Sequence, residues 1–168
     1  RLCEHIEKFI KKSRTENYTF FIQTVSSLIS LKKMGRCTAV MKKLVIEDGL
    51  LLTDMVLFYK GKPLHLKRVL VDTGSGSTIV SADLAESIGI EVEEDDTIYR
   101  ISGVGGSEFV YSKIVDAVII GELQIKDFEV EISAMYYDFN LDGIIGLDLL
   151  QQLKAIINLD ELILTTKR

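Results

Sequence analysis

The sequence predicts a mostly β domain, a closed β-barrel or sandwich carrying two short helices and one long hairpin. Three observations support this fold class. Short apolar runs rich in Val, Ile and Leu recur from residue 44 onward, and turn signals separate them at roughly 8–12 residues. From residue 41 onward, only two short stretches show helical spacing. The chain has 168 residues, of which 47% are hydrophobic, enough for one domain with a real core.

The predicted strands follow one another along the chain. They are expected at Leu44–Ile46, Leu50–Leu52, Met55–Tyr59, Leu64–Val71, Tyr99–Ser102, Glu108–Val115, Ala117–Ile120, Leu123–Ile125, Phe128–Ile132, Ala155–Leu159 and Leu162–Leu164. Turns are expected at Glu47-Asp48-Gly49, Lys60-Gly61-Lys62-Pro63, Gly121-Glu122, Lys126-Asp127 and Asp160-Glu161, because these residue types favour turn conformations.

Two helices interrupt the strands. The first is expected over Ser81–Gly89, with Ser81 as N-cap and Gly89 as the stop signal. The second is expected over Asp148–Leu153. The acidic run Glu91–Asp96 between them is typical of a solvated turn.

Residues 1–40 differ in composition from the predicted domain, residues 41–168. Arg1–Arg14 has the spacing of a basic amphipathic helix. The apolar stretch Phe20–Leu31 is short and interrupted by polar residues, so it predicts no membrane span, and no convincing cleavage pattern marks it as a signal peptide. We expect an N-terminal extension: a helical appendage, a targeting segment or an over-extended reading frame.

Charge and cysteine content limit the function classes. A net charge of −5, with the basic residues concentrated near the start, argues against a nucleic-acid partner. Cys3 and Cys37 lie outside the predicted domain, and His5 and His65 lie far apart. We therefore expect no metal and no cofactor, and the acidic, cysteine-poor domain favours a cytoplasmic location.

One stretch carries the chemistry. The apolar run ending at Val71 delivers Asp72 into a turn containing Gly74 and Gly76, and a second apolar run follows. Taken alone, this is a strand–turn–strand unit whose Asp caps the turn. A carboxylate at the end of a buried strand is also a candidate for a perturbed pKa and a functional role.

Asp72-Thr73-Gly74-Ser75 resembles the active-site motif of aspartic proteases. Two later features strengthen the resemblance: a hairpin tip, Gly103, Val104, Gly105 and Gly106, that looks like a flap, and the segment Ile144, Ile145 and Gly146 before a helix. Their order over residues 44–165 is similar to that of the retropepsin-like branch, which has one motif in each chain.

The resemblance implies specific roles. Asp72 would be the catalytic aspartate, Thr73 would tie two loops together across a dimer axis, and Gly74 would let the backbone approach the carboxylate. Ser75 would donate its hydroxyl to the ionised carboxylate, which favours the ionised form and lowers the pKa of the aspartate pair. Because the chain supplies one such loop, the second aspartate would come from a second copy in a homodimer.

The resemblance also implies an extended peptide or protein substrate held beneath the hairpin. Its apolar pocket walls are expected at Ile101, Val104, Phe109, Ile144 and Ile145. The glycines of the hairpin tip would let it open and close.

Two departures leave the dimer contact open. Retroviral members carry an Asp–Arg ion pair where this chain has Gly76 and Leu147, and here the chain continues into a hairpin over Ala155–Leu164. A catalytically silent dimeric peptide-binding module with the same fold remains an alternative. A strand–Asp-x-Gly–strand unit also resembles the phosphate loop of actin-like kinases and heat-shock ATPases, but that architecture needs two large lobes.

Overall fold

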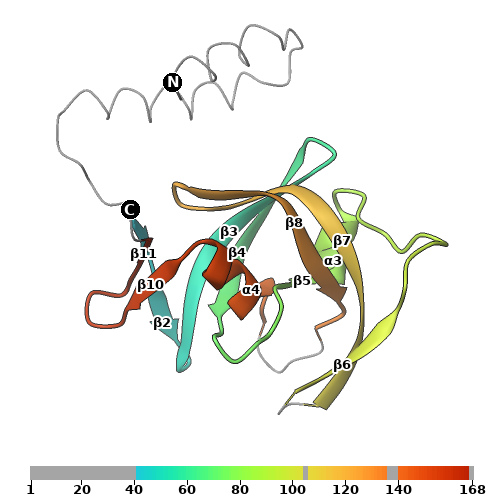
Figure 1. The fold of residues 1–168 in the computed structure, drawn as a ribbon. Helices are drawn as coiled ribbons and strands as arrows, with labels where there is room; N and C mark the ends of the chain where they lie inside the picture. The colour runs from blue at the N-terminus through green and yellow to red at the C-terminus, as the bar shows by residue number, and fades with distance from the viewer. Residues whose placement is uncertain (1–40, 104–105, 136–139, 167–168) are drawn as a thin grey trace, which may run out of the picture. The chain divides into compact units, whose positions relative to one another are not determined.

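The computed structural model describes residues 41–103, 106–135 and 140–166. The predicted N-terminal extension, residues 1–40, lies outside the described residues. The domain is built mainly from β-strands, as the sequence predicts (Figure 1).

Eleven strands and two short helices make up the described part of the chain. The strands are β1 (Met41–Lys43), β2 (Val45–Glu47), β3 (Leu50–Tyr59), β4 (Lys62–Val71), β5 (Ile79–Ser81), β6 (Tyr99–Gly103), β7 (Gly106–Ile120), β8 (Leu123–Ser133), β9 (Gly143–Ile145), β10 (Ala155–Asn158) and β11 (Ile163–Thr166). The helices are α3 (Ala82–Glu86) and α4 (Leu147–Gln152).

The larger sheet closes on itself. Its strands run in the order β2-β3-β4-β9-β5-β8-β7-β6, and β3 also pairs with β7. The pairings from β3 through β4, β9, β5, β8 and β7 therefore return to β3, which leaves no free edge on these six strands. The mostly β, sandwich-like fold predicted from the sequence is confirmed.

Strand β9 has a special place in this circuit. It lies between β4, to which it is parallel, and β5, to which it is antiparallel. Three residues late in the chain are thereby inserted between the strand that ends before Asp72 and the strand that follows the glycine-rich turn. The insertion brings the two ends of the Asp72–Ser75 loop and the late Ile-Ile-Gly motif together.

A second, smaller sheet has the order β1-β11-β10. The hairpin of β10 and β11 was predicted, and its antiparallel register pairs Ala155 with Thr166 and Asn158 with Ile163. Strand β1 adds to its outer side by pairing Met41 with Thr165. No local signal in the sequence indicated this pairing between the start and the end of the domain.

Apolar side chains gather on the two opposite faces of the large sheet. The main core fills the circuit and includes Val69, Val71, Val80, Val130, Ile132 and Ile145. A smaller cluster lies on the other face and contains Leu52, Ile79, Met135, Leu141 and Ile144, with Leu50, Leu70 and Ile101 packed against it. We call this second group the outer cluster. The alternation of the two groups along β4, β5 and β9 follows from the two-residue period of a strand.

Several predicted breaks do not interrupt the strands. The runs at Leu50–Leu52 and Met55–Tyr59 form one strand, with an irregularity between Thr53 and Met55. The turn predicted at Lys126-Asp127 is wrong, because β8 continues through it while paired with β7 on both sides. Asp127 absorbs the local bend with a φ of 49°, a conformation that Asp tolerates better than most residues.

The first helix is shorter than predicted. It covers Ala82–Glu86, and although Ser81 occupies the N-cap position, its side chain makes no capping hydrogen bond. Gly89 has a φ of 87°, so the predicted stop residue does take the left-handed conformation that ends a helix.

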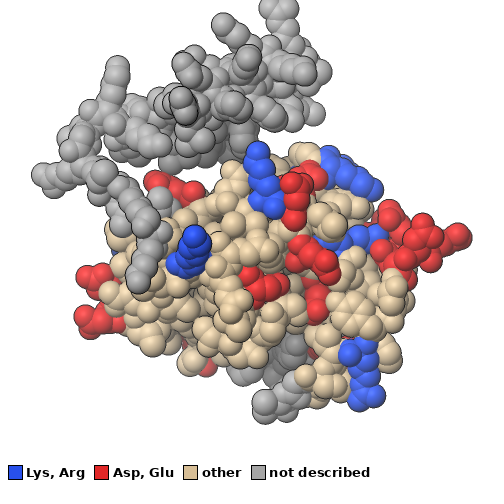
Figure 2. Space-filling view, viewed as in Figure 1, with Lys and Arg blue, Asp and Glu red and all other residues tan. Residues whose placement is uncertain are grey.

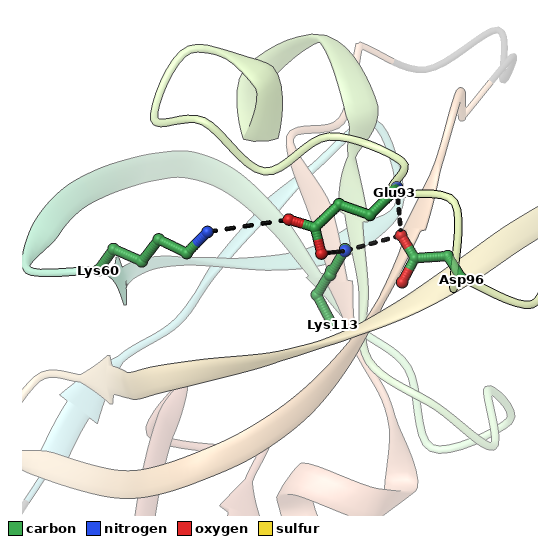
Figure 3. Close-up of polar contacts among 4 residues, drawn as sticks. All are labelled: Lys60, Glu93, Asp96 and Lys113. Atoms are coloured by element: carbon green, nitrogen blue, oxygen red, sulfur yellow. Dashed lines mark hydrogen bonds and ion pairs between the residues drawn. The ribbon is translucent and has the colours of Figure 1, made fainter.

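The acidic run after α3 is not a purely solvated turn. Lys113 of β7, whose side chain is only 8% exposed, binds Glu93 at 2.9 Å and Asp96 at 2.7 Å (Figure 3). Burial acts to lower the pKa of Lys113, but the hydrogen bonds to Asp96 and Glu93 outweigh it and raise this pKa to about 12. The ion pairs fasten the loop between α3 and β6 to the barrel wall.

Candidate active site

Asp72 lies directly after β4, where the strand leaves its partner β9. Its backbone N–H donates to the carbonyl oxygen of Ile145 at 3.0 Å. Its own carboxylate is half-buried and accepts a hydrogen bond from the N–H of Gly74, with 2.8 Å between N and Oδ1. The strand therefore fixes the position of Asp72, and the turn fixes the direction of its side chain.

Gly74 allows this close approach. A Cβ at position 74 would lie 3.1 Å from Oδ1 of Asp72, which is tighter than an ordinary contact. The role expected for Gly74, giving the backbone room beside the carboxylate, agrees with this spacing.

A buried polar network holds the other end of the loop. Thr78, which has no exposed surface, donates its hydroxyl to Oδ1 of Asp148 at 2.7 Å. Its N–H donates to Oδ2 of Asp148 at 3.0 Å, and its hydroxyl oxygen accepts the N–H of Gly146 at 3.1 Å. Both halves of the site are thus joined through one threonine and one aspartate.

The sequence analysis missed Thr78 and Asp148. Thr78 follows a run of glycine and serine and looked like part of a flexible turn, while Asp148 looked like an ordinary residue of a helix's first turn. The signal lay in their spacing from two motifs: six residues after Asp72 and two after Gly146. Thr78 and Asp148 come into contact because β9 is inserted between β4 and β5.

Gly146 lies against the loop with no room for a side chain. A Cβ there would overlap the backbone carbonyl group of Ser77 and lie 2.9 Å from the nitrogen of Thr78. The N–H of the next residue, Leu147, donates to the carbonyl oxygen of Ser75 at 2.8 Å. The glycine in the Ile-Ile-Gly motif is therefore required by close backbone packing.

The hydroxyl of Ser75 does not make the contact we expected. It donates to the carbonyl oxygen of Ser77 at 2.8 Å, so its single proton is directed into the turn and away from Asp72. Ser75 supports the loop by this bond and through its own carbonyl, which accepts from Leu147. The hydroxyl of Ser75 therefore does not make the hydrogen bond to Asp72 on which its expected role depended.

Thr73 is exposed at the edge of a shallow apolar hollow. The hollow is lined by Thr73, Leu147, Leu150, Gln151, Lys154, Ala155 and Ile157. Leu147 and Ile156 beside it are each about 40% exposed. The hollow lies next to the catalytic motif, between α4 and the hairpin of β10 and β11.

The predicted long hairpin is formed by β6 and β7, which pair from Tyr99–Val110 to Gly103–Gly106. Its tip residues Val104 and Gly105 lie outside the described residues. Figure 1 shows the hairpin extending from the barrel on the side away from β10 and β11.

The predicted pocket walls divide between two faces. Ile101 and Ile144 belong to the outer cluster, on the side that Asp72 shares. Phe109 lies on the opposite face of the hairpin and is 72% exposed, and Ile145 is fully buried in the main core. The placement of Phe109 and Ile145 in a pocket wall is wrong, because each is one residue out of phase with the face of Ile101 and Ile144.

The side chains and helices of the described residues fit neither a metal site nor a membrane span. Among the residues that the structure describes, no three His, Cys, Asp or Glu side chains group together as metal ligands. No helix within the described ranges has the length and apolar character to cross a membrane.

The comparisons with known proteins agree with this geometry. The family described as Aspartyl protease matches residues 57–149, more than half of the chain. DNA damage-inducible protein 1 of Eremothecium gossypii is 33% identical over 101 residues, which cover 60% of this chain and 20% of that protein. This chain thus spans about a fifth of the length of that relative.

The crystal structure of a retropepsin-like aspartic protease from Rickettsia conorii matches with a TM-score of 0.53 at 16% identity. The match covers 77% of this chain and 98% of that one, and at this identity it shows the fold alone. Together, the family match and the fold define the class: the chain belongs to the aspartyl protease family and has a retropepsin-like fold.

Proposed function

We propose that this chain is an aspartic endopeptidase that acts as a homodimer. The observation that carries the proposal is the position of Asp72. It is half-buried at the end of a core strand, held by the N–H of Gly74, and on the same side of the sheet as an apolar cluster. Two such carboxylates facing each other would have the parts needed for peptide hydrolysis.

The chemistry requires two carboxyl groups in different protonation states. Two carboxylates held close together cannot both ionise, so one proton is shared between Asp72 and its copy on the partner. The ionised group takes a proton from water, and the oxygen of that water attacks the scissile carbonyl carbon while the protonated group polarises the carbonyl oxygen. The C–N bond then breaks, and the leaving amine takes up a proton.

The exposed apolar surface beside the motif supports a second copy as the source of the missing carboxylate. Thr73 borders the hollow next to Leu147 and Leu150, and an apolar surface adjoining an incomplete site is typical of an interface. A two-fold axis near Thr73 would bring both copies of Asp72 together. The small sheet ending in β10 lies on this same side of the motif.

The hairpin of β6 and β7 supplies a cover for an extended substrate. The side chain of Ile101 faces the outer cluster, so a peptide beneath the hairpin would contact Ile101, Ile144 and Ile79. This apolar wall favours apolar residues beside the scissile bond.

The first experiment compares wild type with Asp72→Asn on an unstructured protein substrate between pH 4 and pH 7. We expect cleavage by wild type and a loss of at least a thousandfold in Asp72→Asn, as on removal of a catalytic group (roughly 10³ or more). Asp48→Asn, which changes an exposed Asp-Gly turn elsewhere, is the matched control. Equal cleavage by wild type and Asp72→Asn would refute the proposal.

A mixing experiment tests the shared site. If wild-type and Asp72→Asn chains are refolded together in equal amounts, random pairing leaves about a quarter of the dimers with two intact aspartates. Activity per total protein should then be about a quarter of that of wild type. A value of one half would show that each chain acts alone. Absence of cleavage by wild type, in a protein that is dimeric in solution, would favour the silent peptide-binding module.

A further inference from the structure

The register of the large sheet places a carboxylate on the same face as the outer cluster. Residues paired across neighbouring strands share a face of the sheet. Leu70 pairs with Ile144, Ile144 with Ile79, and Ile79 with Glu131. The same row continues from Glu131 to Ser112 on β7. In this row, the apolar side chains of Leu70, Ile144 and Ile79 are followed by the polar side chains of Glu131 and Ser112.

Asp72 lies on this face as well. It follows Leu70 by two residues, and side chains two apart along an extended chain point to the same side. Three strand spacings separate Leu70 from Glu131, which amounts to about 14 Å across the sheet. A peptide extended along this face, at about 3.3 Å per residue, would bring a side chain two to four residues from the scissile bond near Glu131.

Glu131 is nine-tenths buried, yet only one of its carboxylate oxygens has a partner. Oε1 accepts a hydrogen bond from the hydroxyl of Tyr99 at 3.0 Å, and that hydroxyl also contacts the hydroxyl of Ser112 at 2.9 Å. Oε2 is buried without a partner among the residues that the structure describes. An unpaired buried carboxylate oxygen costs free energy, so it marks a position where a donor is missing.

The surroundings of Glu131 are acidic. Glu108 lies on the same face and accepts a hydrogen bond from Ser133, and Glu129 stands two residues from Glu131 on the same side of β8. Among the described residues of β5 and β6, of β7 up to Val115 and of β8 from Phe128 onward, no Lys or Arg stands on this face by register. Figure 2 shows acidic side chains gathered near the middle of the drawn face, in the region of β5 and β8.

Tyr99 lies against the carboxylate of Glu131 and donates its hydroxyl to Oε1. It stands at the base of the hairpin and is 37% exposed. Burial raises the pKa of the Tyr99 phenol, and Glu131 and Glu129 raise it further. Tyr99 therefore stays a neutral donor and adds no charge to the site.

We propose that Glu131, with Glu108 and Glu129 beside it, forms a subsite for the basic side chain of a substrate, Lys or Arg. The inference rests on the proposed peptidase function, because it assigns the substrate class of that same cleft. The ammonium or guanidinium group donates to Oε2 of Glu131, and the apolar stem lies along Ile79 and Ile101. The cleft then selects apolar residues at the scissile bond and a basic residue two to four positions away.

The test uses the full chain and a set of peptides with an apolar pair at the scissile position. At each of the positions two, three and four residues away on either side, one residue is Lys, Gln or Glu. At one of these positions we expect wild type to have a kcat/KM about tenfold higher for Lys than for Gln, the scale of one charge-assisted hydrogen bond. The Glu peptide should be the poorest substrate.

Glu131→Gln should reduce the Lys-to-Gln preference, measured as the ratio of kcat/KM values within each protein, to about twofold. Glu122→Gln, which removes the same charge at the far end of the hairpin of β7 and β8, should keep the preference. No preference for Lys by wild type would overturn the inference, whether or not the variant folds. An undiminished preference in a folded Glu131→Gln would overturn it too. That result would indicate that the hydrogen-bond partner of Oε2 is an internal water and not the substrate.

Failure of this inference can be told apart from failure of the proposed function. The same peptides are titrated into Asp72→Asn protein and followed by fluorescence anisotropy, which reports binding without cleavage. Tighter binding of the Lys peptide supports the subsite even if wild type cleaves nothing. Equal binding of the Lys and Gln peptides overturns the subsite even if wild type cleaves both.

Discussion

The close approach of Gly146 to the loop that follows Asp72 makes a sharp prediction about stability. Gly146 has φ −87° and ψ −179°, a conformation open to any residue. Gly146→Ala therefore introduces no backbone strain of its own. Any loss of stability should therefore come from the added methyl group, which would overlap the carbonyl group of Ser77.

The size of that cost follows from the contacts. Forcing a methyl group into a filled space costs about 1–3 kcal/mol. Moving the two backbones apart also weakens two hydrogen bonds, Gly146 to Thr78 at 3.1 Å and Leu147 to Ser75 at 2.8 Å, each worth about 1 kcal/mol. We expect the free energy of unfolding to fall by about 3–5 kcal/mol, with a drop in Tm of about 10 °C.

The assay is urea unfolding followed by circular dichroism, with thermal unfolding alongside. Gly76→Ala is the matched control, because it adds the same methyl group to the same loop where nothing lies within 4 Å. It should change the free energy of unfolding by about 0.5 kcal/mol or less. If Gly146→Ala unfolds like Gly76→Ala, the close packing between the loop and the late motif is not what holds the site together.

Two further predictions concern buried polar groups. Asp148→Ala leaves the hydroxyl and N–H of Thr78 without their acceptor, so unfolding should become easier by about 3 kcal/mol in urea titrations, and Asp148→Asn, which keeps one acceptor, should lose less. Hydrogen bonds from Lys113 and the backbone of Glu93 lower the pKa of Asp96 from 3.8, so its contribution to stability is present above pH 3.8 and is lost as the pH falls through the lowered pKa. Wild type should therefore be more stable than Asp96→Asn at pH 7, and the difference measured by thermal unfolding should disappear on acidification; the exposed Asp95→Asn should show no such pH-dependent difference.

Strand positions could be predicted because they depend on local pattern. The hairpin of β10 and β11 and the long hairpin of β6 and β7 were predicted from alternating apolar residues on either side of turn residues. The failure at Lys126-Asp127 has a tertiary cause. Pairing with β7 on both sides carries β8 through a turn-like dipeptide, and the cost of one left-handed residue is offset by the continuous ladder.

The long-range contacts could not be predicted from a single sequence. The segment Gly143–Ile145 is only three residues long and was predicted as the approach to a helix. Its insertion as β9 between β4 and β5 depends on the whole circuit of strands, and so does the meeting of Thr78 with Asp148. Asp72, Gly74 and Gly146 were predicted as site residues by resemblance, and the close packing at each glycine became visible only in the structure.

The described contacts separate what this chain builds alone from what it lacks. Its own backbone fixes Asp72 through Ile145 and fixes the far end of the loop through Thr78, so the scaffold of the site needs no second molecule. What the described residues do not supply is a second carboxylate opposite Asp72 or a cover for the apolar surface beside Thr73. A fold that holds one aspartate rigidly and leaves an apolar surface next to it lowers the entropic cost of assembling the pair, because the carboxylate is already in place when the partner arrives. In the proposed homodimer, the shared site would therefore come from the dimer, and the stability of each loop from its own chain.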